Sequence, residues 1–143
     1  MKKTTIYRQQ KDENLFEEEL TIDALSAMGN PLEQLSSLVD FEMFRPALED
    51  VLVKKDCKSK AGRPQYDVVL MFKVIFLQRY YGLGDKQIQY QIIDRTSFRQ
   101  FLSIRTVEDV PDEKTVWNVK NQLSQSGTFD TLFTTFREFL NAK

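Results

Sequence analysis

The stretch from Val68 to Tyr81 is apolar on nearly every side, and it constrains the fold more than any other part of the chain. A surface helix gathers its apolar residues in one stripe, whereas a helix that is apolar all round has to be enclosed by other elements. Asp67 stands before the stretch as an N-cap, and Gly82 follows it as a C-terminal glycine. The sequence therefore predicts a central, buried helix.

Capping residues divide the rest of the chain into further helices. Gly29 closes an apolar-periodic segment that begins near residue 12, and Asn30 with Pro31 then opens a short helix. Asp40 caps the next helix, in which Pro46 is acceptable only near the start. With 143 residues and 41% hydrophobic content, the chain can form one domain of ordinary size. We expect an all-α, compact multi-helix domain over residues 12–143, preceded by a flexible polar arm over residues 1–11.

A tight glycine turn follows the central helix. Gly82 and Gly84 flank Leu83, and Asp85 is expected to cap the next helix, over residues 86–93. A helix, a tight turn and a second helix form the arrangement that helix-turn-helix proteins use. The same description fits any two packed helices, most of which do not bind DNA. The sequence thus predicts a helix-turn-helix-like core and leaves its role open.

The last segment, residues 128–143, carries a clean apolar stripe that includes four phenylalanines, Phe129, Phe133, Phe136 and Phe139. Such a stripe is an aggregation liability when it stays exposed. The predicted helix therefore either folds back on the core or mediates self-association.

The compartment follows from cysteine usage and hydropathy. Cys57 is the single cysteine, which excludes an intramolecular disulfide, and no signal peptide opens the chain. The most apolar window, residues 68–77, is interrupted by Lys73 and has about half of the roughly 20 residues that a membrane-spanning helix needs. We expect a protein of a reducing cytoplasm that does not span a membrane.

Basic and acidic residues nearly balance, at 20 and 21, so the net charge of −1 does not by itself support nucleic-acid binding. The distribution is uneven, because residues 40–100 hold 11 basic and 8 acidic groups. Lys58, Lys60 and Arg63 belong to one dense basic cluster. This cluster is either a loop that lies on a phosphate backbone, without reading sequence, or a solvated linker between two helical parts.

The helix predicted to begin at Asp112 presents a polar face opposite its apolar one. The polar positions recur at helical spacing and are Lys114, Asn118, Asn121 and Gln125, bordered by Thr115 and Gln122. Asn and Gln form bidentate hydrogen bonds with adenine in the major groove, so this face suits base reading. It is equally an ordinary solvent face. Trp117, at its edge, is expected to pack in the core or in an interface rather than to stack on bases.

Catalysis is not expected from these residues. Without histidine, a Ser/His or Cys/His nucleophile pair is excluded. Two-metal chemistry needs carboxylates that converge from separate elements. The available set is Asp94, Glu108, Asp109, Asp112 and Glu113. Capping, the helix dipole and loop positions account for most of these acids. We expect no enzymatic activity, no metal, no cofactor and no small-molecule ligand.

Three segments carry a resemblance to a known family: Gly62–Asp85, Asp94–Leu102 and Val110–Thr115. They are similar to the N-terminal domain of insertion-sequence family five (InsH-like) transposases, over about residues 13–140. The resemblance implies binding to the double-stranded DNA at the ends of the element. The polar face that begins at Lys114 would read bases. The proposed phosphate contacts are Lys58, Lys60, Arg63, Arg95 and Arg99.

In that family an Asp-Asp-Glu catalytic domain, the part that requires Mg²⁺, follows this region, and we expect it to be absent from this chain. A second hypothesis is a helical interaction module, in which the 128–143 helix pairs with itself or with an intact transposase and so inhibits transposition. A remnant without function is the remaining alternative.

Overall fold

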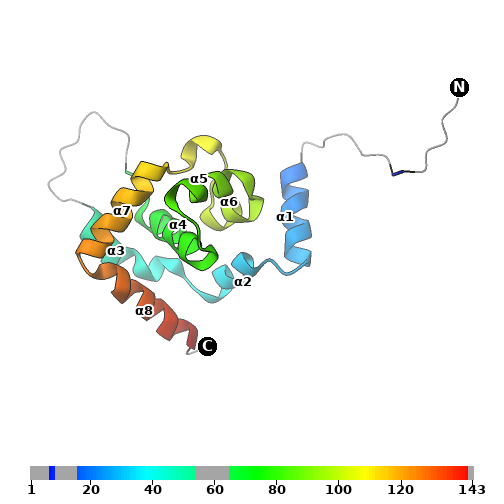
Figure 1. Cartoon of the computed structure of the whole chain (residues 1–143). Coiled ribbons are helices and arrows are strands. Elements are labelled where there is room, and N and C mark those ends of the chain that lie inside the picture. Colours follow the sequence, from blue (N-terminus) through cyan, green and yellow to red (C-terminus); the bar gives the residue numbers. More distant parts are fainter. Residues whose placement is uncertain (1–6, 9–15, 54–64, 142–143) are drawn as a thin grey trace, which may run out of the picture.

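The all-α class is confirmed by the structure, a computed structural model that describes residues 7–8, 16–53 and 65–141. These ranges contain eight α-helices, two short 3-10 helices and no strand (Figure 1). The helices are α1 Glu17–Ala27, α2 Pro31–Leu38, α3 Arg45–Leu52, α4 Val68–Tyr81, α5 Asp85–Asp94, α6 Thr96–Leu102, α7 Glu113–Gln125 and α8 Thr128–Asn141; the 3-10 helices are η1 Phe41–Phe44 and η2 Val107–Asp109. The expected arm over residues 1–11 lies almost wholly outside the described residues.

Helix α4 is the centre of the domain, as its sequence predicts. It contacts α3, α5, α6 and α7, which surround it in Figure 1, and nine of its residues are buried. The Asp67 carboxylate caps it by accepting hydrogen bonds from the backbone N–H groups of Val69 and Leu70, at 3.1 and 3.2 Å. Gly82 ends it in the left-handed conformation, with φ +66°, where a side chain would add strain.

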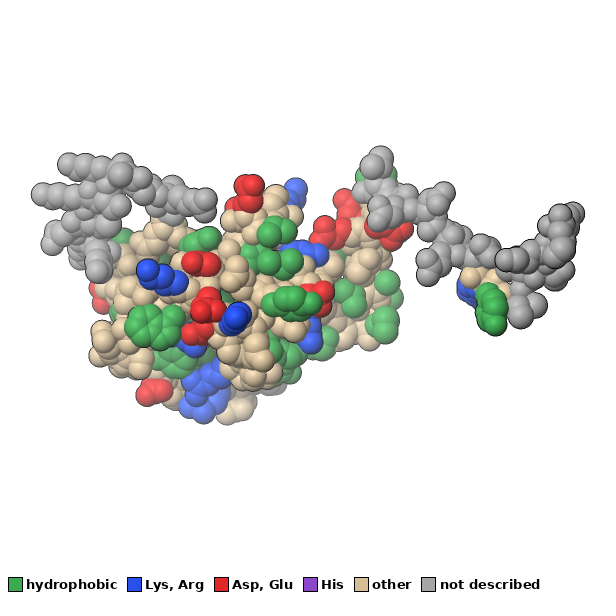
Figure 2. Space-filling view, turned by 45° about the horizontal axis from the view of Figure 1, so that its top comes forward, with side chains coloured by type: hydrophobic (Ala, Val, Ile, Leu, Met, Phe, Trp, Pro, Cys, Tyr) green, Lys and Arg blue, Asp and Glu red, His purple; other side chains and the backbone are tan. Residues whose placement is uncertain are grey.

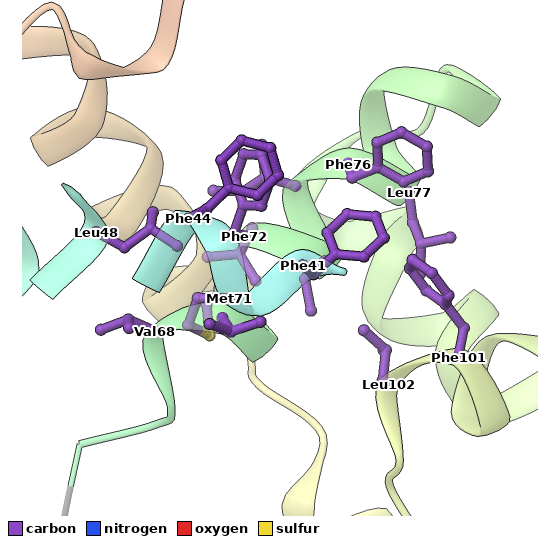
Figure 3. Close-up of a cluster of buried hydrophobic side chains, with 14 of the residues drawn as sticks. Phe41, Phe44, Leu48, Val68, Met71, Phe72, Phe76, Leu77, Phe101 and Leu102 are labelled. Carbon is purple, nitrogen blue, oxygen red and sulfur yellow. The ribbon is translucent and has the colours of Figure 1, made fainter. Parts of the chain in front are cut away.

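A cluster of aromatic rings fills the space between α4 and its neighbours (Figure 3). Phe41 of η1 lies at the middle of this cluster, and its ring centroid is 5.5–6.3 Å from those of five other phenylalanines. These five are Phe44, Phe72, Phe76, Phe101 and Phe136. Such centroid spacings are typical of favourable tilted and edge-to-face pairs. The short η1 thereby joins α4, α6 and α8 into one core.

The phenylalanine stripe of α8 folds back on this core. Leu132, Phe133 and Phe136 are buried, and the Phe136 ring centroid lies 5.1 Å from that of Phe76. The guanidinium of Arg79 lies over the Phe133 ring at 4.6 Å from its centroid, which adds a cation–π contact between α4 and α8. Of the two roles expected for this stripe, folding back is the one observed.

Most of the expected caps are confirmed, and one is wrong. Asn30 accepts from the Leu32 N–H at 3.1 Å, and Asp40 accepts from the Glu42 N–H at 3.0 Å. Helix α5, however, is capped at Gly84 rather than Asp85. Gly84 donates its backbone N–H to the Gln87 side chain at 2.8 Å, whereas the Asp85 carboxylate points to partners on other helices.

An exposed ionic clamp holds the start of α3 against the start of α4. The Arg45 guanidinium donates to Glu42 Oε1 and to Asp67 Oδ1, both at 2.7 Å. The Arg45 hydrogen bond is the main reason that the pKa of Asp67 lies below its usual range, and it lowers the pKa of Glu42 likewise. Because the groups are solvent-accessible, screening keeps the contribution of the clamp to stability small.

Phe136→Ala should destabilise the domain by about 3–5 kcal/mol, because it removes a ring that fills the space between α4, α8 and η1. Urea unfolding monitored by circular dichroism measures the change. Thr135→Ala, at the neighbouring exposed position of the same helix, is the control and should shift stability by no more than about 0.5 kcal/mol. Equal effects of the two substitutions would mean that α8 is not docked.

Asp67→Asn should reduce the loss of stability that the domain undergoes as the pH falls. The lowered pKa of Asp67 means that the unfolded chain binds more protons than the folded one near and below pH 4, so wild-type stability falls as pH falls there. Asparagine still caps α4 but cannot form an ion pair with Arg45. The Tm of the variant at pH 7 should therefore be a few degrees lower than that of the wild type, and it should fall less as the pH falls. Thermal unfolding between pH 2.5 and pH 7 tests this. Asp50→Asn, on the exposed face of α3, should keep the wild-type slope.

Candidate nucleic-acid interface

Helix α7 is held so that its expected polar face lies at the surface. Asp112 caps the helix, and Val116 and Leu123 are fully buried against the helices that α7 contacts, α3, α4, α5 and α8. On the other side, Lys114, Asn118 and Gln125 are exposed. The remaining candidates, Asn121, Thr115 and Gln122, are half-buried. The structure thus gathers all six predicted residues on one helix and exposes three of them fully.

Thr115 has a local role in the cap. Hydrogen bonds from its side chain and from its backbone N–H lower the pKa of Asp112, and the backbone bond is 3.3 Å long. The same residue therefore stabilises the start of the helix that presents Lys114 and Asn118.

An ion pair fixes α7 against α5. Lys120 pairs with the Asp85 carboxylate, which also accepts a hydrogen bond from the buried Gln78 side chain at 2.8 Å. Burial opposes ionisation of Asp85, but the bonds from Lys120 and Gln78 outweigh it and lower the pKa of that carboxyl. Asp85 and Lys120 thus neutralise each other and set the relative position of the two helices.

The two arginines near this unit differ in their surroundings. Arg99 donates to the backbone oxygens of Ile92 and Ile93, and at 3.1 Å to Glu18 of α1. Its guanidinium is thus occupied in tying α1 and α6 to the end of α5. Arg95 is exposed, and its guanidinium lies 5.0 Å from the centroid of the Phe98 ring, which leaves its outer side to solvent.

The other expected phosphate contacts, Lys58, Lys60 and Arg63, lie outside the described residues. On the face shown in Figure 2, Lys and Arg side chains alternate with Asp and Glu side chains instead of forming one basic field. An interface on this domain has to depend on local groups more than on net charge.

Trp117 does not pack in the core, so that part of the expectation is wrong. It is 55% exposed and lines a shallow depression of about 500 Å³ between α5 and α7. The other lining residues are Asp85, Lys86, Glu113 and Lys114. Lys86 did not stand out in the sequence, because a single lysine in the first turn of a helix is an ordinary solvent-facing residue.

Metal and membrane signatures were sought in the described parts of the chain. Residues 7–8, 16–53 and 65–141 contain no group of three or more His, Cys, Asp or Glu side chains placed to hold a metal ion. Within the same ranges, no helix combines the length and the apolar character needed to cross a bilayer.

The structure is an all-helical domain whose helix α7 presents an exposed polar face. A family model described as "Transposase domain (DUF772)" matches residues 20–122, from within α1 to near the end of α7. The chain belongs to this transposase-domain family. No curated protein and no solved structure matches it.

The surroundings of Arg99 predict a stability defect in its variants. Arg99→Met keeps much of the aliphatic stem but leaves two backbone carbonyls and Glu18 without their guanidinium partner, so stability should fall by about 1–3 kcal/mol. Arg105→Met, at a nearby exposed arginine, should change stability by at most about 0.5 kcal/mol. Urea midpoints measure both, and a neutral Arg99→Met would contradict the structural role.

Proposed function

We propose that this chain is the DNA-binding N-terminal domain of an insertion-sequence family five transposase and that it recognises the terminal inverted repeats of its element. The observation that carries the proposal is the exposed polar face of α7, in a chain that belongs to a transposase-domain family. Such a domain acts on the nucleoid, within the cytoplasm. The proposal assigns no catalytic role to any residue of this chain.

The first step of the argument is the chemistry of α7. Its exposed face offers two amides, Asn118 and Gln125, and the ammonium of Lys114, with Asn121 half-exposed between them. Amide side chains bond both the N6 and N7 positions of adenine, and lysine bonds guanine. A 13-residue helix is about 20 Å long, so its exposed side can follow several base pairs of a major groove.

The second step is the support behind that face. The buried contacts of Val116 and Leu123, and the ion pair of Lys120 with Asp85, hold the helix from behind. Base reading needs side chains on a rigid element, since a loose helix cannot select one hydrogen-bond pattern over another. The placement of α7 meets this requirement.

The proposed phosphate contacts position the domain without reading sequence. Exposed Arg95 is one of them, and Lys58, Lys60 and Arg63 are proposed from the sequence alone, because they lie outside the described residues. Arg99 enters the proposal as a residue that supports the fold, since its guanidinium is bonded within the chain.

The burial of the α8 stripe bears on the alternative of a helical interaction module. Self-association through Phe133 or Phe136 requires these rings to leave the core that they complete. The residues of the stripe that stay partly exposed are Phe129, Phe139 and Leu140. Because most of the stripe is already used in the core, we keep DNA binding as the main proposal and self-association through α8 as the alternative.

Asn118→Ala and Lys60→Ala should weaken DNA binding in different ways. Removing the Asn118 amide should cost about 1–3 kcal/mol on a duplex from the element end and nothing on a scrambled duplex, so the preference between them falls. Lys60→Ala should weaken both duplexes alike and reduce the slope of log K against log salt by about 0.9. Fluorescence anisotropy at two salt concentrations measures both effects.

Gln34→Ala, which removes an exposed amide on α2, is the matched control and should leave both duplex affinities unchanged. If Asn118→Ala and Lys60→Ala behave identically, the division between base reading and phosphate contact is wrong. If the wild-type chain binds both duplexes equally, and only at low salt, sequence recognition by α7 is rejected.

A further inference from the structure

An exposed tryptophan beside two lysines marks a second candidate site on the same pair of helices. Trp117 of α7 lines the depression of about 500 Å³ together with Lys86 of α5 and Lys114 of α7. More than half of the Trp117 side chain is open to solvent. An exposed indole in a depression that two lysines also line offers both an apolar face and positive charge, which suits a ligand with an apolar face and negative charge.

The side chains that line the depression carry a net positive charge when the ion pair between Asp85 and Lys120 is taken into account. Of the two acids that line it, Asp85 is neutralised by Lys120 from the neighbouring turn of α7. Glu113 is then the one lining carboxylate set against the ammonium groups of Lys86 and Lys114. The local excess of positive charge contrasts with the net charge of −1 of the whole chain.

We propose that this depression binds one unpaired nucleotide of single-stranded DNA, with the base stacked on the Trp117 indole and the flanking phosphates paired with Lys86 and Lys114. Aromatic side chains next to basic groups are the means by which proteins hold single strands, because every base has a π-face and every linkage has a phosphate. The inference rests on the proposed DNA-binding function. It adds a second form of DNA, an unpaired strand, to the duplex proposed for α7.

The site suits a splayed base better than an intact duplex. Trp117 lines a shallow depression between α5 and α7, and a base can lie flat on its indole only when that base leaves the stack of a duplex. Asn118 follows Trp117 directly on the exposed side of α7. Lys114 belongs both to the face proposed for base reading and to the lining of the depression, so a duplex read by α7 would lie next to the depression.

The chain contains a single tryptophan, so its fluorescence reports on this site alone. Titration with an oligothymidylate of about eight nucleotides should quench the emission in a saturable manner. A fully abasic oligomer of the same length carries the phosphates without bases and should leave the emission nearly unchanged. Oligoglutamate should not compete with the oligothymidylate. Equal quenching by the abasic oligomer, or competition by oligoglutamate, would show a site for negative charge only and overturn the inference.

Binding of a fluorescently labelled oligothymidylate tests the residues separately. Trp117→Ala should weaken it about tenfold, Lys86→Ala should weaken it several-fold and reduce its salt slope, and Glu113→Gln should strengthen it. All three positions are exposed, so the variants should retain the wild-type circular dichroism and urea midpoint. Unchanged affinity of a folded Trp117→Ala variant would overturn the inference.

The duplex from the element end separates this inference from the proposed function. Trp117→Ala should keep the duplex preference that Asn118→Ala loses. Preserved duplex recognition without oligothymidylate binding rejects the single-strand site alone. If the wild-type chain shows neither a preference for the duplex from the element end nor binding to the oligothymidylate, the proposed function is rejected as well.

Discussion

The enclosure of α4 is the constraint on which the rest of the domain depends. A helix that is apolar on nearly all sides cannot face water, so α3, α5, α6 and α7 each have to turn one face toward it, and the Phe41 cluster closes the space beside it. Each surrounding helix then has an opposite face that packing does not use. The polar face of α7 is therefore a consequence of the core: Val116 and Leu123 point inward, and the residues on the opposite side of the helix are left for solvent or for a ligand.

The contact between α5 and α7 shows how polar contacts fix the relative position of two helices, which hydrophobic burial alone does not determine. Apolar packing sets which helices touch, but it is not directional. The carboxylate of Asp85, held by Lys120 and by buried Gln78, adds a directional contact at the place where the first turn of α5 meets α7. Half-burial makes this pair stronger than a surface pair, although its ions also lose hydration. Both proposed DNA sites include α7, and the single-strand site also includes α5, so the geometry of both depends on this contact.

Local signals predicted the elements well, and long-range contacts account for the errors. The caps at Asn30, Asp67 and Asp112 are readable because a cap and its partner lie within three residues. Asp85 is predicted as the cap of α5 from its local sequence, but its carboxylate pairs with Lys120, 35 positions away. Gly84 and Gln87 form the cap instead. The bonding of Arg99 within the fold is likewise not readable from local sequence, because its partner Glu18 belongs to α1. Trp117 is exposed although its residue type indicates burial, because its position relative to α5 decides its exposure.

A nearly neutral domain places particular demands on DNA recognition. Counterion release by many lysines and arginines supplies most of the affinity of basic DNA-binding proteins, and each phosphate contact contributes about 0.9 to the salt slope. Here the face shown in Figure 2 mixes charges of both signs. Arg99, moreover, is bonded within the fold. Contacts that are insensitive to net charge, amide hydrogen bonds from Asn118 and Gln125 and stacking on Trp117, must then carry a larger share of the proposed affinity. Such contacts depend on position to within a fraction of an ångström, so they require a firmly held α7, and its packing against α3, α4, α5 and α8 meets this requirement.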